Sequence, residues 1–205
     1  MNAFTKRGEI AGPAGLLSVA VDTTPDLPVR GLAVVCHPHP LQGGTMDNKV
    51  VTTVARALLQ RGWRVVRFNY RGVGKSEGSW DEGRGEVDDA LAVIAAHRAA
   101  GEPLVLGGFS FGGYVAASAA MKLPEADRPQ RLVLVAPATA KYGTPPVVAD
   151  SLLIHGEADE VVPLQHSLDW ARPQALPVVV VPGAGHFFHG QLPLLKALVS
   201  RHFAE

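Results

Sequence analysis

The chain has 205 residues, 47% hydrophobic and 19% charged, so it is long and apolar enough to bury a core as one domain spanning 1–205. Its 19 basic and 19 acidic residues cancel, and nothing in this balance predicts a nucleic-acid partner. The N-terminal residues lack the apolar stretch of a signal peptide, and no apolar run approaches a membrane span, so we expect no membrane partner. A single cysteine, Cys36, excludes an internal disulfide, fits a reducing, cytoplasmic compartment and is expected to be a buried core residue.

Short apolar runs alternate with helical patterns along the chain. Two weak strands are predicted near 7–11 and 15–22, and six mostly β-branched runs are predicted as buried strands at 31–37, 63–69, 103–108, 131–136, 151–155 and 177–181. Helices are predicted at 47–61, 86–100, 111–122, 163–171 and 191–203, the first, second and fourth of them starting at or next to Asp47, Glu86 and Pro163. This alternation predicts an α/β fold with a mainly parallel sheet and helices on both faces. Functional residues of such folds gather at the carboxyl ends of the strands.

The string "GFSFG" at 108–112 joins a predicted strand to a predicted helix. It matches G-x-S-x-G in the context where a sharp turn exposes a nucleophilic serine. Gly108 and Gly112 would avoid collisions beside this turn. The N–H of Phe111 would be free at the helix N-terminus, where the dipole favours negative charge. Ser110 is therefore a candidate nucleophile and Phe111 a candidate donor to an oxyanion, with an incidental serine in a glycine-rich turn as the alternative.

A serine nucleophile needs a base, and the base needs an acid that orients it. In hydrolases with this turn, the three residues follow in the order serine, acid, histidine. Asp159 lies in "HGEADEVVP" after one predicted strand, and His186 lies in "PGAGHFFHG" after the next. We expect these two residues to act with Ser110.

The same two loops hold three rivals: Glu157, Glu160 and His189. The glutamates share the loop of Asp159. His189 follows His186 by three residues, and we expect it to support the site from behind or to cap a helix. His186 is preferred because Gly-Ala-Gly directly precedes it, and a tight loop can aim its side chain over the sheet edge.

Five strings together resemble the α/β-hydrolase superfamily over nearly the whole chain, and especially a small bacterial branch of serine hydrolases without a lid: "CHPHPLQGGTMDNKVV", "FNYRGVGKSEG", "GFSFGGYVA", "IHGEADEVVP" and "PGAGHFF". The resemblance implies an eight-stranded sheet whose second strand is antiparallel. It also implies a catalytic triad of Ser110, Asp159 and His186. One departure is Asn69, where many members carry Asp at a position that is usually structural.

A second oxyanion donor is expected from the loop "HPHPLQGG" after the third strand. Pro38 and Pro40 have no N–H to give. Counting from the end of the strand favours His39. Aligning His39-Pro40 with the His-Gly of relatives favours Leu41, which we place first while keeping both.

The histidines of this loop also allow a metal hypothesis. His37 and His39 could join His186 and His189 in a zinc site. No carboxylate follows them at a familiar ligand spacing, and the serine turn already accounts for His186. We therefore expect neither a metal nor a cofactor.

The connections leave no room for a cap over the site. The segment "ATAKYGTPPVVAD" before the seventh strand carries Gly143, Pro145 and Pro146, which disfavour helix. An open site is expected, with a rim formed by 39–46, 72–84 and 138–149. The string "YRGVGKSEG" contains Gly-Lys-Ser, but Asn69, directly before it, stands where a phosphate loop requires glycine, so we expect a tight loop instead. Three side chains of this region are expected near the rim: Lys75, Ser76 and Trp80.

These features predict a serine hydrolase that cleaves an ester or thioester of a small molecule through an acyl-enzyme. An amidase or peptidase would use the same residues on a harder bond. A binding protein without turnover on the same fold is the third possibility, because fold does not fix function.

Overall fold

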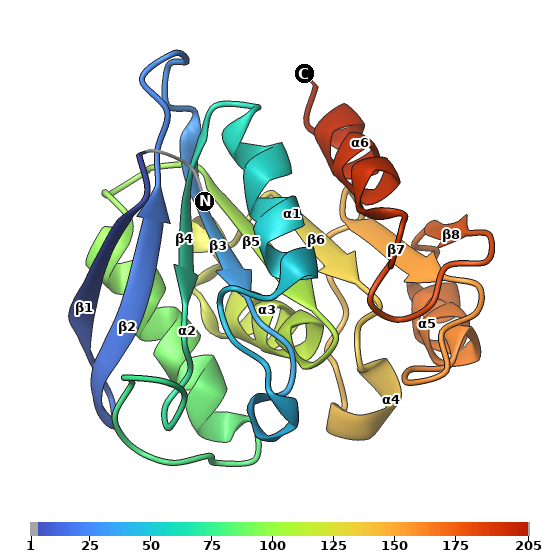
Figure 1. The fold of residues 1–205 in the computed structure, drawn as a ribbon, viewed down its shortest axis with the longest axis horizontal. Helices are drawn as coiled ribbons and strands as arrows, with labels where there is room; N and C mark the ends of the chain where they lie inside the picture. Colours follow the sequence, from blue (N-terminus) through green and yellow to red (C-terminus); the bar gives the residue numbers. More distant parts are fainter. Residues whose placement is uncertain (1–3, 205) are drawn as a thin grey trace.

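The computed structural model describes residues 4–204, which build one eight-stranded sheet in the order β1-β2-β4-β3-β5-β6-β7-β8 (Figure 1). The strands are β1 (Lys6–Gly12), β2 (Gly15–Asp22), β3 (Gly31–Cys36), β4 (Trp63–Phe68), β5 (Leu104–Phe109), β6 (Arg131–Val135), β7 (Leu152–Gly156) and β8 (Val178–Val181). Strand β2 runs antiparallel to β1 and β4, and the other neighbouring pairs are parallel. The expected sheet, with its antiparallel second strand, is confirmed.

Helices cover both faces of the sheet (Figure 1). They are α1 (Lys49–Leu59), α2 (Arg84–His97), α3 (Phe111–Lys122), α4 (Thr139–Tyr142), α5 (Leu164–Ala171) and α6 (Leu192–His202). One hydrophobic cluster joins one face of the sheet to α1 and α6, and a second joins the other face to α2, α3 and α5. All six residues of β3 and of β5 are buried, because helices cover them from both sides. This explains why their sequences are continuously apolar instead of alternating.

Helices α1 and α2 each begin two residues away from the start that the sequence predicts. Helix α1 begins after Asn48, whose Oδ1 accepts the N–H of Val50 at 2.8 Å and so caps the helix. Helix α2 begins earlier than predicted, at Arg84. Glu86 is its third residue, and the Glu86 carboxylate accepts the N–H of Gly83 at 2.8 Å.

Helix α4 is a single turn that the sequence does not predict. Gly143, with a φ of 63°, ends it in the left-handed conformation that glycine adopts without strain. The expectation that Gly143 and the two prolines disfavour helix in this segment was wrong for this one turn, because the turn is complete before these residues are reached. The segment between β6 and β7 still contains no cap, as expected.

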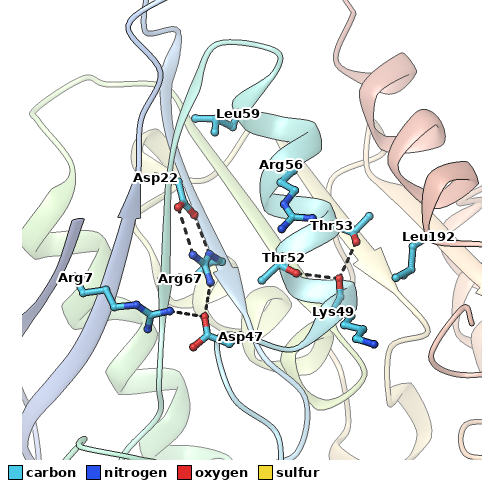
Figure 2. Close-up of a pocket in the computed structure, with 10 residues that line it drawn as sticks. All are labelled: Arg7, Asp22, Asp47, Lys49, Thr52, Thr53, Arg56, Leu59, Arg67 and Leu192. Atoms are coloured by element: carbon cyan, nitrogen blue, oxygen red, sulfur yellow. Dashed lines mark hydrogen bonds and ion pairs between the residues drawn. The ribbon is translucent and has the colours of Figure 1, made fainter. Parts of the chain in front are cut away.

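A groove of about 560 Å³ lies between α1 and the sheet near β2 and β4 (Figure 2). A chain of ion pairs crosses its floor. Arg67 Nε lies 2.8 Å from Asp22 Oδ2, Arg67 Nη1 lies 3.1 Å from Asp47 Oδ1, and Arg7 Nη2 lies 2.7 Å from the same oxygen. The network ties β1, β2 and β4 to the loop before α1. It also explains why Asp47 does not begin the helix.

The loop after β4 contains one correction to the expected rim. Ser76 is buried beneath β2, where its Oγ accepts the N–H of Ser18 at 2.9 Å and donates to Asn69 O at 2.8 Å. Asn69 Oδ1 accepts the N–H of Met46 at 2.9 Å, so the departure at this position serves a structural hydrogen bond. Lys75 lines a separate cleft beside β1 and β2.

Candidate active site

Ser110 lies in the turn between β5 and α3, where its backbone takes a conformation that only glycine adopts readily. Its φ of 56° and ψ of −119° imply strain on the order of 1–3 kcal/mol. The Ser110 N–H donates to Val135 O at 2.9 Å. The Ser110 carbonyl accepts the N–H of Gly113 at 2.9 Å and of Ala138 at 3.1 Å. These bonds from β6, α3 and the loop after β6 hold the strained residue at the carboxyl end of β5.

The glycines on either side of Ser110 are required by space. A Cβ at Gly108 would lie 2.0 Å from the Gly112 oxygen, and a Cβ at Gly112 would lie 2.3 Å from the Cys36 oxygen. Backbone would have to move in both cases. The first collision lies within the turn, as expected, and the second is with the end of the neighbouring strand β3.

Asp159 and His186 meet in the loops after β7 and β8. Asp159 Oδ2 lies 2.7 Å from His186 Nδ1, and Asp159 Oδ1 accepts the N–H of Val161 at 2.9 Å and of Val162 at 2.8 Å. Burial alone would raise the pKa of the Asp159 carboxyl. Hydrogen bonds from His155, His186 and Val162 outweigh burial and hold that pKa well below its usual range. The side chain is therefore a carboxylate at neutral pH.

The loops of all three predicted residues open at the same edge of the sheet, because β5, β6, β7 and β8 are successive neighbours. The ring of Phe109, which directly precedes Ser110, lies 4.8 Å from the His186 ring between centroids. A carboxylate that accepts the proton of His186 Nδ1 fixes the imidazole tautomer and leaves Nε2 free to act as a base.

The loop after β3 contains both candidates for a second oxyanion donor. His39 precedes the short turn Pro40–Gln42, and the N–H of Leu41 donates to His39 Nδ1 at 3.2 Å. Leu41 is 70% exposed. Phe111 is the first residue of α3, so its N–H belongs to the turn that no helical carbonyl can serve.

The three segments expected at the rim meet around His39. Its ring lies 4.7 Å from Trp80, 5.4 Å from Phe111 and 6.4 Å from Tyr142, between centroids. Burial in this aromatic cage and the charge of Lys141 lower the pKa of His39. The cage therefore favours a neutral His39, whose Nδ1 can accept the Leu41 N–H.

The rival residues lie apart from the Asp159–His186 pair. Glu157 Oε2 accepts the N–H of Gly183 at 2.9 Å, and Glu160 is exposed. His189 is exposed, and α6 begins after Gln191 without a side-chain cap, so the expected capping role of His189 is wrong.

His37 does not join the other histidines of the metal hypothesis. It is buried, its Nδ1 lies 2.7 Å from Pro38 O, and its Nε2 accepts the N–H of Tyr70 at 3.2 Å. Within residues 4–204, no three His, Cys, Asp or Glu side chains are placed to share a metal ion. In the same residues, no helix has the length and hydropathy needed to cross a bilayer.

One buried side chain at this site was missed from sequence. His155 lies at the end of β7, and its Nε2 is 3.3 Å from Asp159 Oδ2. In the sequence it is only a polar residue at the end of an apolar run. The spacing of four residues to Asp159 was the sole available clue.

A mostly parallel sheet with a strained serine turn after β5, and no cap, defines an α/β serine hydrolase without a lid. More narrowly, the chain belongs to the family described as serine aminopeptidase, S33, whose sequence model matches residues 28–150.

Two solved structures agree with the class of α/β serine hydrolase, and a further relative is similar in sequence. A serine hydrolase without a lid from Xanthomonas campestris shares 41% identity, with a TM-score of 0.89 over 100% of this chain and 95% of that one. An α/β serine hydrolase homologue from Coxiella burnetii shares 40% identity, with a TM-score of 0.87 over 98% and 97%. An uncharacterised protein of Rickettsia prowazekii is 33% identical over 193 residues, covering 86% of this chain and 79% of its own.

Proposed function

We propose that this protein hydrolyses an ester or thioester of a small molecule through an acyl-enzyme formed on Ser110. The observation that carries the proposal is that a strained serine and a hydrogen-bonded Asp159–His186 pair belong to loops at the same edge of the sheet. Strain persists in a fold only where surrounding structure enforces it, and it gathers at functional sites.

In the proposed reaction, His186 Nε2 takes the proton from Ser110 Oγ while Oγ attacks the substrate carbonyl. The tetrahedral intermediate collapses, and His186 gives that proton to the departing alcohol or thiol. Water then attacks the acyl-enzyme with His186 again as the base, releasing the acid and restoring Ser110. Asp159 orients His186 and stabilises its charged form.

We assign the oxyanion hole to the N–H groups of Phe111 and His39. Leu41, which the sequence places first, is less suited because its N–H already donates to His39 Nδ1. A structure of a phosphonate adduct tests the choice. Its oxyanion should lie 2.7–3.1 Å from the two proposed nitrogens, and a contact to Leu41 N instead would reverse the assignment.

Labelling with a fluorophosphonate probe tests the nucleophile. The unaltered protein and the exposed-serine control Ser79→Ala should label and should hydrolyse short p-nitrophenyl esters. Ser110→Ala should do neither while keeping its circular dichroism spectrum. Labelling that survives in Ser110→Ala contradicts the proposal, and a folded protein that never labels supports the binding-protein alternative.

A peptidase or amidase is the second candidate, favoured by the description of the family that residues 28–150 match. Aminoacyl p-nitroanilides assayed beside the esters separate the two. We expect the esters to have the higher kcat/KM, because the amide bond is harder to break. A preference for the anilides would replace our proposal with the second one.

A further inference from the structure

A buried histidine contacts the oxygen of the proposed catalytic acid that also faces His186. His155 is fully buried at the end of β7. Its Nε2 lies 2.8 Å from Val162 O and 3.3 Å from Asp159 Oδ2, and its Nδ1 lies 2.8 Å from Ser167 Oγ in α5. Both of its ring nitrogens therefore have partners, two in the loop after β7 and one in α5.

These partners determine which nitrogen carries the proton. The Val162 carbonyl can only accept, so Nε2 must be protonated. That N–H is shared between the Val162 oxygen and the Asp159 carboxylate. In a neutral ring Nδ1 is then bare, and it accepts the hydroxyl proton of Ser167.

The Asp159 carboxylate consequently has contacts on every side. Oδ1 accepts two backbone N–H groups, from Val161 and Val162, and Oδ2 faces both His186 Nδ1 and His155 Nε2. An apolar side chain at position 155 would leave the Val162 carbonyl and the Ser167 hydroxyl buried without this partner, a costly arrangement. The chain instead places a histidine whose Nε2 also contacts Asp159 Oδ2.

The geometry points to His155 as a positioning residue that, with Ser167, holds the Asp159 carboxylate in the orientation that serves His186. The relay runs from Ser167 through His155 and Asp159 to His186. It rests on the proposed function, because its effect reaches substrate only through the Ser110 reaction. His155 itself touches no reacting atom.

Three variants test the relay by ester kinetics. His155→Phe should lower kcat by about 10- to 100-fold, the usual effect of removing a partner that orients a functional ligand, with KM nearly unchanged. His155→Gln keeps an N–H at similar reach and should recover most of that loss. Ser167→Ala removes one hydrogen bond and should cost about 2- to 10-fold. The matched control is His166→Gln, which replaces an exposed histidine next to Ser167 in α5 and should leave kcat and KM unchanged.

A double-variant cycle shows whether His155 acts through the acid. In the Asp159→Asn background, His155→Phe should have almost no further effect on the labelling rate, because the group that it positions is gone. Fully additive losses would overturn the relay. So would an unchanged kcat in His155→Phe. If the unaltered protein itself does not label, both the proposed function and the relay are wrong. That result differs from the two above, in which the unaltered protein labels and only the relay is wrong.

An NMR measurement on the unaltered protein covers the case in which His155→Phe does not fold. The ¹⁵N shifts of the His155 ring at neutral pH should show a protonated Nε2 and a bare Nδ1. A ring protonated at Nδ1 alone would overturn the inference, because such a ring cannot donate to Val162 O or to Asp159.

Discussion

Acidification should weaken the folded state through one buried histidine, His37. Burial lowers its pKa from 6.5 to about 3, against the opposing effect of the hydrogen bond to Pro38 O. A second proton would also have to occupy Nε2, which now accepts the N–H of Tyr70. The folded protein therefore keeps His37 neutral under conditions in which the unfolded chain takes up a proton.

The size of the effect follows from the two pKa values. Stability from this site is complete above pH 6.5 and is lost as the pH falls from 6.5 towards 3, because only the unfolded state binds the proton in that window. Each pH unit costs about 1.4 kcal/mol once the unfolded histidine is charged. Between pH 7 and pH 5 the free energy of unfolding should fall by about 2 kcal/mol. The Asp159 carboxyl, whose pKa is lowered in the folded protein, adds to the loss of stability only below about pH 5.

Urea unfolding at pH 7, 6 and 5 measures this loss. His39 and His97 also have lowered pKa values through burial, so the comparison needs a variant. His37→Gln keeps an acceptor for the Tyr70 N–H but cannot titrate, and its stability should fall much less between pH 7 and pH 5. The exposed His189→Gln is the control and should keep the full dependence. An equal slope in His37→Gln and the unaltered protein would refute the reasoning.

Four further outcomes are expected. Asp159→Asn should lower kcat by about 10⁴, as in other triads where the imidazole loses its correct tautomer, measured with p-nitrophenyl acetate. Gly108→Ala should cost at least about 1–3 kcal/mol in urea unfolding, because its Cβ would lie 2.0 Å from the Gly112 oxygen. Gly107→Ala, whose Cβ would have no contact closer than 3.5 Å, should be tolerated, and equal losses in the two would contradict the steric argument. Arg67→Met should lower the free energy of unfolding by about 3–5 kcal/mol because it leaves the buried Asp22 carboxylate without its charged partner. An unchanged free energy of unfolding would show that solvent reaches the Asp22 carboxylate. Because no cap covers the site, short-chain esters should be hydrolysed faster than long-chain ones. The rate should show no jump at the micellar concentration of the substrate, and such a jump would indicate interfacial activation.

Most of the parallel strands were predictable because they are short β-branched runs buried on both faces, whereas the antiparallel second strand followed from the family resemblance. The three proposed catalytic residues could be found because their types follow a fixed order after successive strands. Neither inference needed knowledge of side-chain packing.

Features that depend on packing were not predictable in the same way. His155 contacts Ser167, twelve residues away in a different element, and only its spacing of four residues from Asp159 marks it in the sequence. Ser76 stands in a loop beside polar residues, yet β2 covers it. Helix α1 begins at the residue after Asn48 because Asp47 is taken by two arginines from distant strands.

The reaction rate of the buried Cys36 thiol can be used to measure how often the fold opens locally. Burial raises the pKa of the Cys36 thiol to about 12, against a smaller opposing effect of Tyr70, so only about one molecule in ten thousand carries a thiolate at pH 8. A soluble disulfide reagent can react at an appreciable rate only when the end of β3 comes away from its neighbours. The Cys36 carbonyl packs against Gly112 at the start of α3, so that opening also disturbs the Ser110 turn. Labelling rates of Cys36 in native buffer would therefore report how often the serine turn loosens, with no substitution in the chain.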